Sequence, residues 1–328
     1  MRFDQFKRRE FITLLGGTAA AWPLAARAQQ PAMPVVGFLS SAVDGDRVDG
    51  FRRGLAETGF SEGRNIAIAY RWAEGRYDRL PTLAAELVRH PVAVLVASGI
   101  TATRAAQAST STIPIVFHTG GDPVGLGLVA SLAKPHGNLT GVASWGKVLA
   151  AKQLELLNEF VSKTAPVAFL INPNNAVAQA EIGDARAAAG TLGRKLLVVE
   201  AGSERDFDAA FTTIVRERAG ALLLQADPFL SSRRDELVAL AARHAVPTIS
   251  PYLDYAAAGG LLSYGSSLSD ALRLVGNYTG RILKGEKPAD LPVQQAVKVE
   301  LIVNLKTAKA LGLTLPTAIL LRADAVIE

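Results

Sequence analysis

The chain contains no cysteine, and only four histidines occur among its 328 residues. The missing thiols exclude disulfides, thiolate zinc sites, cysteine nucleophiles and a lipid anchor on an N-terminal cysteine. Because scattered histidines rarely assemble a metal site, no bound metal is expected. Aromatic residues are also scarce, at 6%, whereas 49% of the residues are hydrophobic and 20% are charged. These fractions are typical of a globular protein, and the length suggests about two domains.

Excess positive charge is concentrated at the start of the chain. The 35 basic and 30 acidic residues give a net charge of +5. Five of the basic and two of the acidic residues lie within the first 28, so the rest of the chain has a net charge of only +2. Because nucleic-acid binding requires a clustered basic face, we expect no nucleic-acid partner.

Residues 1–28 have the pattern of an export signal. Lys7-Arg8-Arg9-Glu10 precedes an uncharged apolar run over 11–24, and Ala26-Arg27-Ala28 has the small-x-small pattern of a signal-peptidase site. The adjacent arginines fit a twin-arginine signal, which exports folded proteins. The apolar run contains Pro23 and is shorter than the roughly 20 residues of a membrane-spanning helix. We therefore expect a cleaved signal and a mature protein in the periplasm.

Short β-rich segments alternate with amphipathic segments in two successive series. Continuous apolar runs such as 92–96 and 221–224 indicate strands buried on both faces, as in parallel sheets covered by helices. We expect an α/β fold of two doubly wound, Rossmann-like lobes joined by a hinge. The expected strands are 35–39, 65–70, 92–96 and 113–117, then 167–171, 195–199, 221–225 and 247–250. The expected helices are 47–58, 77–89, 101–109, 176–189, 207–216 and 233–244.

The chain is expected to cross between the lobes more than once, which would create a hinge. Segment 138–144 is the first expected crossover, because glycines punctuate it at Gly137, Gly141 and Gly146. We assign 33–140 plus 259–288 to lobe I and 141–258 plus 289–328 to lobe II. The remaining expected elements are helices at 150–161, 268–283 and 305–311 and strands at 260–264 and 297–303.

Polar residues follow the expected strands, at the edge where open α/β sheets bind ligands. Serine, threonine, asparagine and aspartate in such places also cap helices and form turns. His118 is expected to line the cleft, whereas His90, His136 and His244 are expected to be structural. The polar segments are Ser40-Ser41, 98–101, 118–123, 172–175, 227–229 and 251–255.

These polar segments suit a small zwitterion. Ser98 and Thr101 flank the start of a helix, whose free N–H groups and dipole can bind a carboxylate. Asp122 or Asp227 can pair with an ammonium group. Aromatic side chains that can pack on the ligand are Trp145, Tyr252 and Tyr255.

Motifs of common α/β enzymes are absent. The chain has no G-x-S-x-G nucleophile elbow and no G-K-[ST] phosphate loop. Ser40-Ser41-Ala42 follows the first expected strand where a dinucleotide-binding fold has G-x-G-x-x-G. Metalloprotease and EF-hand patterns are missing as well. We expect no catalytic residue, no cofactor and no enzymatic activity.

Long segments spread over the chain have sequences that occur together in one protein family. They are RREFITLLGG (8–17), YRWAEGRYDRLPTLAAELV (70–88), the stretch 113–142, INPNN (171–175), ADPF (226–229), AGGLLSYG (258–265), RILKGEKPADLPVQQ (281–295) and ELIVNLKTAKALGL (300–313). On these segments the chain resembles the periplasmic substrate-binding proteins of ABC transporters, specifically the tryptophan/tyrosine type. The resemblance covers nearly the whole chain, the expected signal included.

The resemblance implies a type 1 periplasmic-binding-protein fold with three crossovers. It also implies capture of a solute by hinge closure and delivery to a membrane permease driven by a separate ATPase subunit. Receptors of this class usually work as monomers. The cleft residues that the resemblance implies are Ser40, Ser41, Ser98, Thr101, Thr119, Asp122, Asn174, Asp227 and Tyr252.

We therefore expect the solute-binding component of an ABC importer, with an aromatic or other amino acid as the first ligand to test. One alternative is a periplasmic sensor that reports ligand binding to a membrane receptor. Another is an exported α/β enzyme, which needs a nucleophile–base or metal constellation that the sequence does not contain. A sugar-responsive repressor shares the two-lobe architecture, but it has a DNA-binding headpiece where this chain has its expected export signal.

Overall fold

The computed structural model describes residues 33–42, 45–144, 148–295 and 299–328. The expected signal at 1–28 and the candidate ligand-packing residue Trp145 lie outside these ranges. The chain divides into Met1–Pro34 and Val35–Glu328, and both sheets of the protein belong to the second unit. No helix in the described part is both long and apolar enough to cross a bilayer.

The described residues form two sheets, in which nearly all neighbouring strands are parallel. The first has six strands in the order β11-β5-β4-β3-β1-β2, and the second has seven in the order β13-β12-β10-β9-β8-β6-β7. Among the described strands, only the β10–β12 pair is antiparallel. The first sheet comprises β1 (Val35–Ser40), β2 (Ala67–Trp72), β3 (Val92–Ser98), β4 (Ile115–Thr119), β5 (Leu139–Ala143) and β11 (Gln294–Gln295). The second comprises β6 (Val167–Ile171), β7 (Leu196–Glu200), β8 (Ala221–Leu224), β9 (Thr248–Tyr252), β10 (Leu262–Ser266), β12 (Glu300–Asn304) and β13 (Ala325–Ile327).

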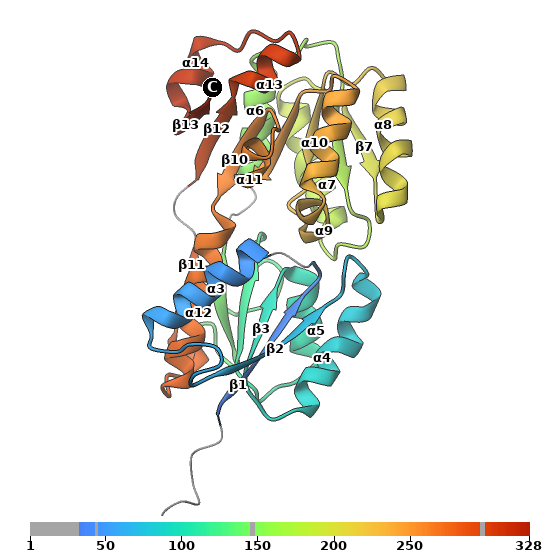
Figure 1. Ribbon diagram of the computed structural model, residues 1–328. Coiled ribbons are helices and arrows are strands. Elements are labelled where there is room, and N and C mark those ends of the chain that lie inside the picture. Colours follow the sequence, from blue (N-terminus) through green and yellow to red (C-terminus); the bar gives the residue numbers. More distant parts are fainter. Residues whose placement is uncertain (1–32, 43–44, 145–147, 296–298) are drawn as a thin grey trace, which may run out of the picture. The chain divides into compact units, whose positions relative to one another are not determined.

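Helices lie on both faces of the first sheet, with α3 and α12 on one side and α4 and α5 on the other (Figure 1). In the first part of the chain the helices are α3 (Gly45–Glu57), η1 (Tyr77–Arg79), α4 (Leu80–Arg89) and α5 (Ile100–Ser109). The second part contains α6 (Val148–Asn158), α7 (Ala178–Thr191), η2 (Glu204–Asp206), α8 (Phe207–Arg216), α9 (Pro228–Ser232), α10 (Arg234–Arg243) and α11 (Asp254–Ala257). The C-terminal helices are α12 (Leu268–Leu283), η3 (Pro288–Asp290), α13 (Leu305–Ala310) and α14 (Thr317–Arg322).

The strands contribute alternate side chains to separate hydrophobic cores. In β3, Val94 and Val96 join the core under α3 and α12, whereas Leu95 and Ala97 join the core under α4 and α5. The same alternation occurs in β8, where Leu222 and Leu224 lie in one core and Ala221 and Leu223 in another. Strands buried on both faces have no polar side, which explains the continuous apolar runs of the sequence. The expected α/β fold of two doubly wound lobes is confirmed.

Helix α12 belongs to the C-terminal third of the chain but packs against α3 of the first sheet (Figure 1). Glycines make this close packing possible. A Cβ atom on Gly54 would lie 1.8 Å from the carbonyl oxygen of Arg273, and one on Gly276 would lie 2.1 Å from that of Phe51. Any larger residue at these positions would force the helices apart. The two glycines therefore allow α12 to dock on the first sheet.

The strand assignments place the crossovers at different residues from those expected. The segment 138–144 contains β5, which pairs with β4 and so belongs to the first sheet. Gly141 marks close packing within that strand, because a Cβ atom there would lie 2.2 Å from the carbonyl oxygen of Phe117. Gly141 therefore lies within a strand and does not mark the crossover that the sequence predicted.

Two further elements lie in the other sheet from the one expected. Strand β10 pairs with β9 in the second sheet, although 259–288 was assigned to lobe I. Strand β11 pairs with β5 in the first sheet, although 289–328 was assigned to lobe II. Apolar periodicity shows that a segment is a strand but not which sheet accepts it. The chain thus crosses between the sheets after β5, after β10 and after β11, in agreement with the three crossovers that the resemblance implied.

Candidate functional site

Most of the predicted site residues lie at the carboxyl ends of the parallel strands. Ser40, Ser98 and Thr119 end β1, β3 and β4, and all three are buried. The register pairs Ser40 with Ser98 and places His118 opposite Ser98. In the second sheet, Tyr252 ends β9 and is buried. The first sheet therefore brings together residues that lie up to about 80 positions apart in the sequence, as parallel topology requires.

Asp227 is fully buried and accepts hydrogen bonds from four protein donors. The Tyr77 hydroxyl donates to Oδ2 at 2.6 Å, and Asn175 Nδ2 donates to the same oxygen at 2.9 Å. Asn172 Nδ2 and the N–H of Leu230 donate to Oδ1 at 3.3 and 3.0 Å. Burial raises the pKa of Asp227, and these hydrogen bonds act against that effect. Asp227 was one of two candidates for an ammonium partner, but its contacts come from the protein itself.

Tyr77 belongs to the first half of the chain, so its bond to Asp227 joins the two sheets. Desolvation raises the pKa of the Tyr77 hydroxyl well above its usual range, and the charge of Asp227 adds to the effect. The hydroxyl therefore remains a donor at all physiological pH values. A second bond between the halves runs from the N–H of Ala176 to Oγ1 of Thr101, at 3.3 Å. Thr101 was expected to contact ligand, whereas its hydroxyl here accepts from the protein.

A cavity of about 320 Å³ opens beside this network, and we call it the main cavity. Its volume is at the lower end of the range of ligand pockets. The first sheet contributes the loop after β4, and the second contributes α6, α7, Phe169 of β6 and the ends of β8 and β9. Its walls are Gly120, Gly121, Asp122, Gly125 and Leu126 on one side and Leu149, Ala150, Gln153, Phe169, Val177, Ala180, Glu181, Asp184, Leu223, Leu224, Gln225, Ala226 and Pro251 on the other.

A small pocket of about 20 Å³ shares part of its wall with the main cavity. Ser98 lines it, and the Ser98 hydroxyl is buried without a hydrogen-bond partner among the described residues. Gly99, which precedes α5, has a φ angle of +98°, a conformation that favours glycine. The shared wall consists of Gly120, Gly121, Val177, Glu181 and Ala226, and the small pocket is completed by Ile100, His118, Thr119, Asn175, Pro228, Tyr252 and Leu268.

The other predicted residues divide between this site and places away from it. Asp122 lines the main cavity, and its Oδ1 accepts from the N–H of Val124 at 3.0 Å. Ser41 is buried after β1. Asn174, in contrast, is exposed and lines a shallow pocket with Glu200 and Asp206. The neighbouring asparagines 172 and 175, which reach Asp227, occupy the position that had been expected for Asn174.

The histidines lie largely where the sequence suggested, whereas Tyr255, a candidate for packing on the ligand, does not line the cavities described above. Nε2 of His118 is 2.6 Å from the Ser144 hydroxyl, and His118 lines the small pocket. His244 stacks on Phe211 with ring centroids 5.7 Å apart. His90 and His136 are exposed. Tyr255 is fully buried and lies outside both the main cavity and the small pocket.

Sequence reasoning missed Glu181 and Gln225. Glu181 follows the N-terminus of α7, and its Oε2 accepts from Gln225 Nε2 at 2.6 Å. Burial raises the pKa of the Glu181 carboxyl to about 7. The predicted site residues come from segments that follow strands, whereas Glu181 lies in the first turn of α7. The signal that could have found it is helical spacing, because 177, 180, 181 and 184 share one face of α7.

Comparisons with known proteins identify the family. Residues 33–327 match the family model of the ABC transporter substrate binding proteins, and the chain belongs to that family. A tyrosine-binding protein of Clostridioides difficile is 24% identical over 80% of this chain and 76% of its own. A conserved domain protein of Vibrio cholerae is 26% identical, with a TM-score of 0.82, over 90% of this chain and 99% of its own. An ABC domain of Streptococcus pneumoniae in complex with L-Trp is 24% identical, with a TM-score of 0.81, over 90% of this chain and all of its own.

Proposed function

We propose that this protein is the solute-binding component of an ABC importer and that it binds a small amino acid-like solute in the main cavity. The observation that carries the proposal is the composition of the cavity wall, which comes from the loop after β4 and from α6, α7, β6, β8 and β9. A ligand in such a site contacts both sheets at once. Membership of the substrate-binding family and the absence of enzyme motifs in the sequence support a binding role rather than a catalytic one.

The chemistry of the wall suits an amino acid with an apolar side chain. Leu126, Leu149, Phe169, Val177 and Leu223 provide apolar surface in the main cavity. The small pocket offers the unpartnered Ser98 hydroxyl beside the start of α5, where helix N–H groups favour a carboxylate. Relatives named for binding tyrosine and crystallised with L-Trp support an aromatic amino acid as the first ligand to test.

Hinge closure provides the mechanism of capture. The three crossovers allow the sheets to rotate against each other through a few residues. The bonds from Tyr77 to Asp227 and from Ala176 to Thr101 join the two halves of the chain. Ligand shifts the population towards the form in which both halves contact it, because only that form makes the full set of contacts. The closed form then docks on a membrane permease, whose ATPase subunit drives release and transport.

We also propose that the protein is exported to the periplasm and that it works there as a monomer. The twin-arginine pattern of 1–28 supports export. Fractionation of cells that express the full chain, with and without an Arg8→Lys/Arg9→Lys change, tests the export step. The expected result is a processed periplasmic protein for the natural sequence and an unprocessed cytoplasmic one for the variant. Equal export of both would contradict the twin-arginine route.

Thermal unfolding of the purified protein against a panel of amino acids, aromatic acids, purines and sugars tests ligand binding. A ligand present at 100 times its Kd adds about 2.7 kcal/mol to the free energy of unfolding and raises the Tm. We expect a shift with one or a few amino acids. Shifts with sugars or purines alone would contradict an amino acid cargo, and conversion of any ligand to a product would contradict a binding-only role.

A further inference from the structure

Glu181 faces both the main cavity and the small pocket, and its carboxyl accepts one hydrogen bond from the described residues. Its Oε2 accepts from Gln225 Nε2, and no described residue donates to Oε1. An ionised carboxylate has about four acceptor sites. Most of the hydrogen-bonding capacity of Glu181 is therefore available to a molecule in the cavity.

Gln225 holds this carboxyl in one orientation. The Gln225 side chain is buried, and its Oε1 accepts the N–H of Asn172 at 2.7 Å. Because a backbone N–H can only donate, Nε2 must be the atom that points to Glu181. Glu181 is thus an acceptor towards the protein, and its position is fixed before any ligand binds.

The ionisable groups near Glu181 are mostly acidic. The pKa of Glu181 is raised to about 7, mainly by burial; the charges of Asp227 and Asp184 add to this rise, and the hydrogen bond from Gln225 acts against it. Asp184 lies one turn further along α7, and Asp227 follows β8. The described residues provide no ion-pair partner for Glu181. Other titratable side chains in the two walls are Asp122 on the loop after β4, His118 on β4 and Tyr252 on β9.

Ser98 provides an independent sign that the site is built for a ligand. It is 1% exposed, and its hydroxyl has no partner among the described residues. A buried hydroxyl without a partner costs free energy, and a ligand in the small pocket would remove that cost. Ser98 and Glu181 line the same small pocket. One polar molecule can therefore satisfy both groups.

We propose that Glu181 binds the ammonium group of the solute and gives up its own proton when it does so, while Ser98 and the start of α5 hold the solute's carboxylate. This inference rests on the proposed function, because it specifies how an amino acid binds in the same cavity. The step is balanced: a neutral carboxylic acid and an ammonium ion become a carboxylate–ammonium pair, and one proton leaves to solvent. Glu181 belongs to the walls of both pockets. The side chain on the α-carbon of the solute can therefore extend into the main cavity while the ammonium group contacts Glu181.

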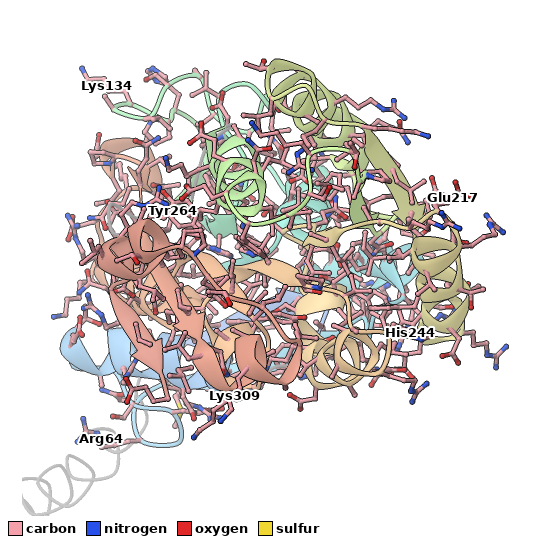
Figure 2. The ribbon with its side chains drawn as sticks, turned by 90° about the horizontal axis from the view of Figure 1, so that it is seen from above. Arg64, Lys134, Glu217, His244, Tyr264 and Lys309 are labelled. Atoms are coloured by element: carbon pink, nitrogen blue, oxygen red, sulfur yellow. The ribbon has the colours of Figure 1, made fainter. Side chains whose placement is uncertain are left out.

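The test compares matched ligands and matched variants by titration calorimetry. The ligands are L-tyrosine, tyramine, which lacks the carboxylate, and 3-(4-hydroxyphenyl)propionate, which lacks the ammonium group, together with the other standard amino acids. Glu181→Gln keeps an oxygen that can accept from Gln225 but cannot carry a charge. Glu217→Gln makes the same change on an exposed side chain at the end of α8, which points away from the protein (Figure 2).

We expect Glu181→Gln to weaken binding of the amino acid ligand and of tyramine about 10- to 100-fold at pH 8. Binding of 3-(4-hydroxyphenyl)propionate should be unchanged or tighter. In the unaltered protein, Kd should fall as the pH rises from 5.5 to 8, and titrations at pH 6 in buffers of different ionisation enthalpy should show nearly one proton released. Both pH effects should vanish in Glu181→Gln and persist in Glu217→Gln.

Two results overturn the inference but leave the proposed function intact. One is equal binding of an amino acid by Glu181→Gln and the unaltered protein, and the other is binding at pH 6 without proton release. If the unaltered protein binds 3-(4-hydroxyphenyl)propionate or other solutes without an ammonium group but no amino acid or amine, the inference and the amino acid cargo both fail. If the unaltered protein binds none of these compounds, the inference about Glu181 and the amino acid cargo fail as well.

Discussion

Asp227, which is fully buried, and Glu181, which is partly buried, are two carboxyls of one hydrogen-bond network, and they differ in the number of protein donors. Asp227 accepts from four donors, and one of them, Tyr77, comes from the other half of the chain. Glu181 accepts from Gln225 alone among the described residues and lines the main cavity. Burial raises the pKa of both carboxyls. A carboxyl whose acceptor sites are filled by the protein stabilises the fold, whereas one that keeps free acceptor sites can bind a ligand.

Among the changes that test this comparison, Asp227→Ala is expected to have the largest effect on stability. The change leaves the Tyr77 hydroxyl and the amides of Asn172 and Asn175 buried without their acceptor. We expect the free energy of unfolding to fall by about 3–5 kcal/mol, as for a broken buried charge network. Urea unfolding of the purified variant measures it. Asp227→Asn, which keeps an oxygen of similar position, should lose less, and an unchanged midpoint for Asp227→Ala would contradict the structural role of Asp227.

Glu181→Gln should raise the free energy of unfolding of the ligand-free protein, whereas Asp227→Ala should lower it. An ordinary glutamate titrates near 4.5, whereas the pKa of Glu181 in the fold is about 7. The unfolded state therefore loses this proton first, and the stability of the unaltered protein falls as the pH rises between these values. The Gln variant has no such loss, so it should gain roughly 3 kcal/mol relative to the unaltered protein between pH 4 and pH 8. Urea unfolding at pH 4 and pH 8 measures this difference. The same stability difference between the two proteins at both pH values would contradict the raised pKa.

Tyr77→Phe removes one of the hydrogen bonds that join the two halves of the chain. The variant keeps the aromatic ring in the core and removes the hydroxyl that donates to Asp227. We expect a loss of about 1–2 kcal/mol in the free energy of unfolding and weaker ligand binding through a larger open population. Small-angle scattering without ligand should show a more extended average form. Scattering curves identical to those of the unaltered protein would indicate that Tyr77 does not help to hold the sheets together.

The smallest expected effect is the difference in stability loss between substitutions of two neighbouring asparagines. Asn175 Nδ2 donates to Asp227 and is buried, whereas Asn174 is exposed in a shallow pocket. Asn175→Ala should cost about 1 kcal/mol, and Asn174→Ala should change stability by less than about 0.5 kcal/mol. Thermal unfolding of the pair, together with their ligand affinities, makes the comparison. A larger loss for Asn174→Ala would restore the role that the sequence suggested for it.

Sequence patterns were sufficient for the type of element and for the fold class. The run 92–96 and the amphipathic stretch 77–89 indicated a buried strand and a covering helix, and β3 and α4 lie there. The C-terminal elements α14 and β13 were not expected, because they are short and largely exposed. Strand β5 was not expected either, since Gly141 had the appearance of a break.

The sequence could place those expected site residues that stand at the end of a strand in the first sheet. Ser40, Ser98 and Thr119 lie side by side because parallel strands end at one edge. Asn174 and Glu181 could not be placed in this way. Their positions depend on the turn after β6 and on the rotation of α7, which decides that residues 177, 181 and 184 face the main cavity.

The sequence by itself determined the two series of strands and helices and the polar residues at the strand ends, because hydrophobic periodicity and parallel topology are local and repeating properties. The tertiary structure alone decided how many donors from the described residues each carboxyl has: four for Asp227 and one for Glu181. Asp227 and Glu181 are both carboxylic acids; Asp227 lies shortly after β8, and Glu181 lies in the first turn of α7. Their difference arises from donors that are distant in the chain, with Tyr77 reaching Asp227 across 150 residues. No local pattern contains that contact, since it forms only when the two sheets meet.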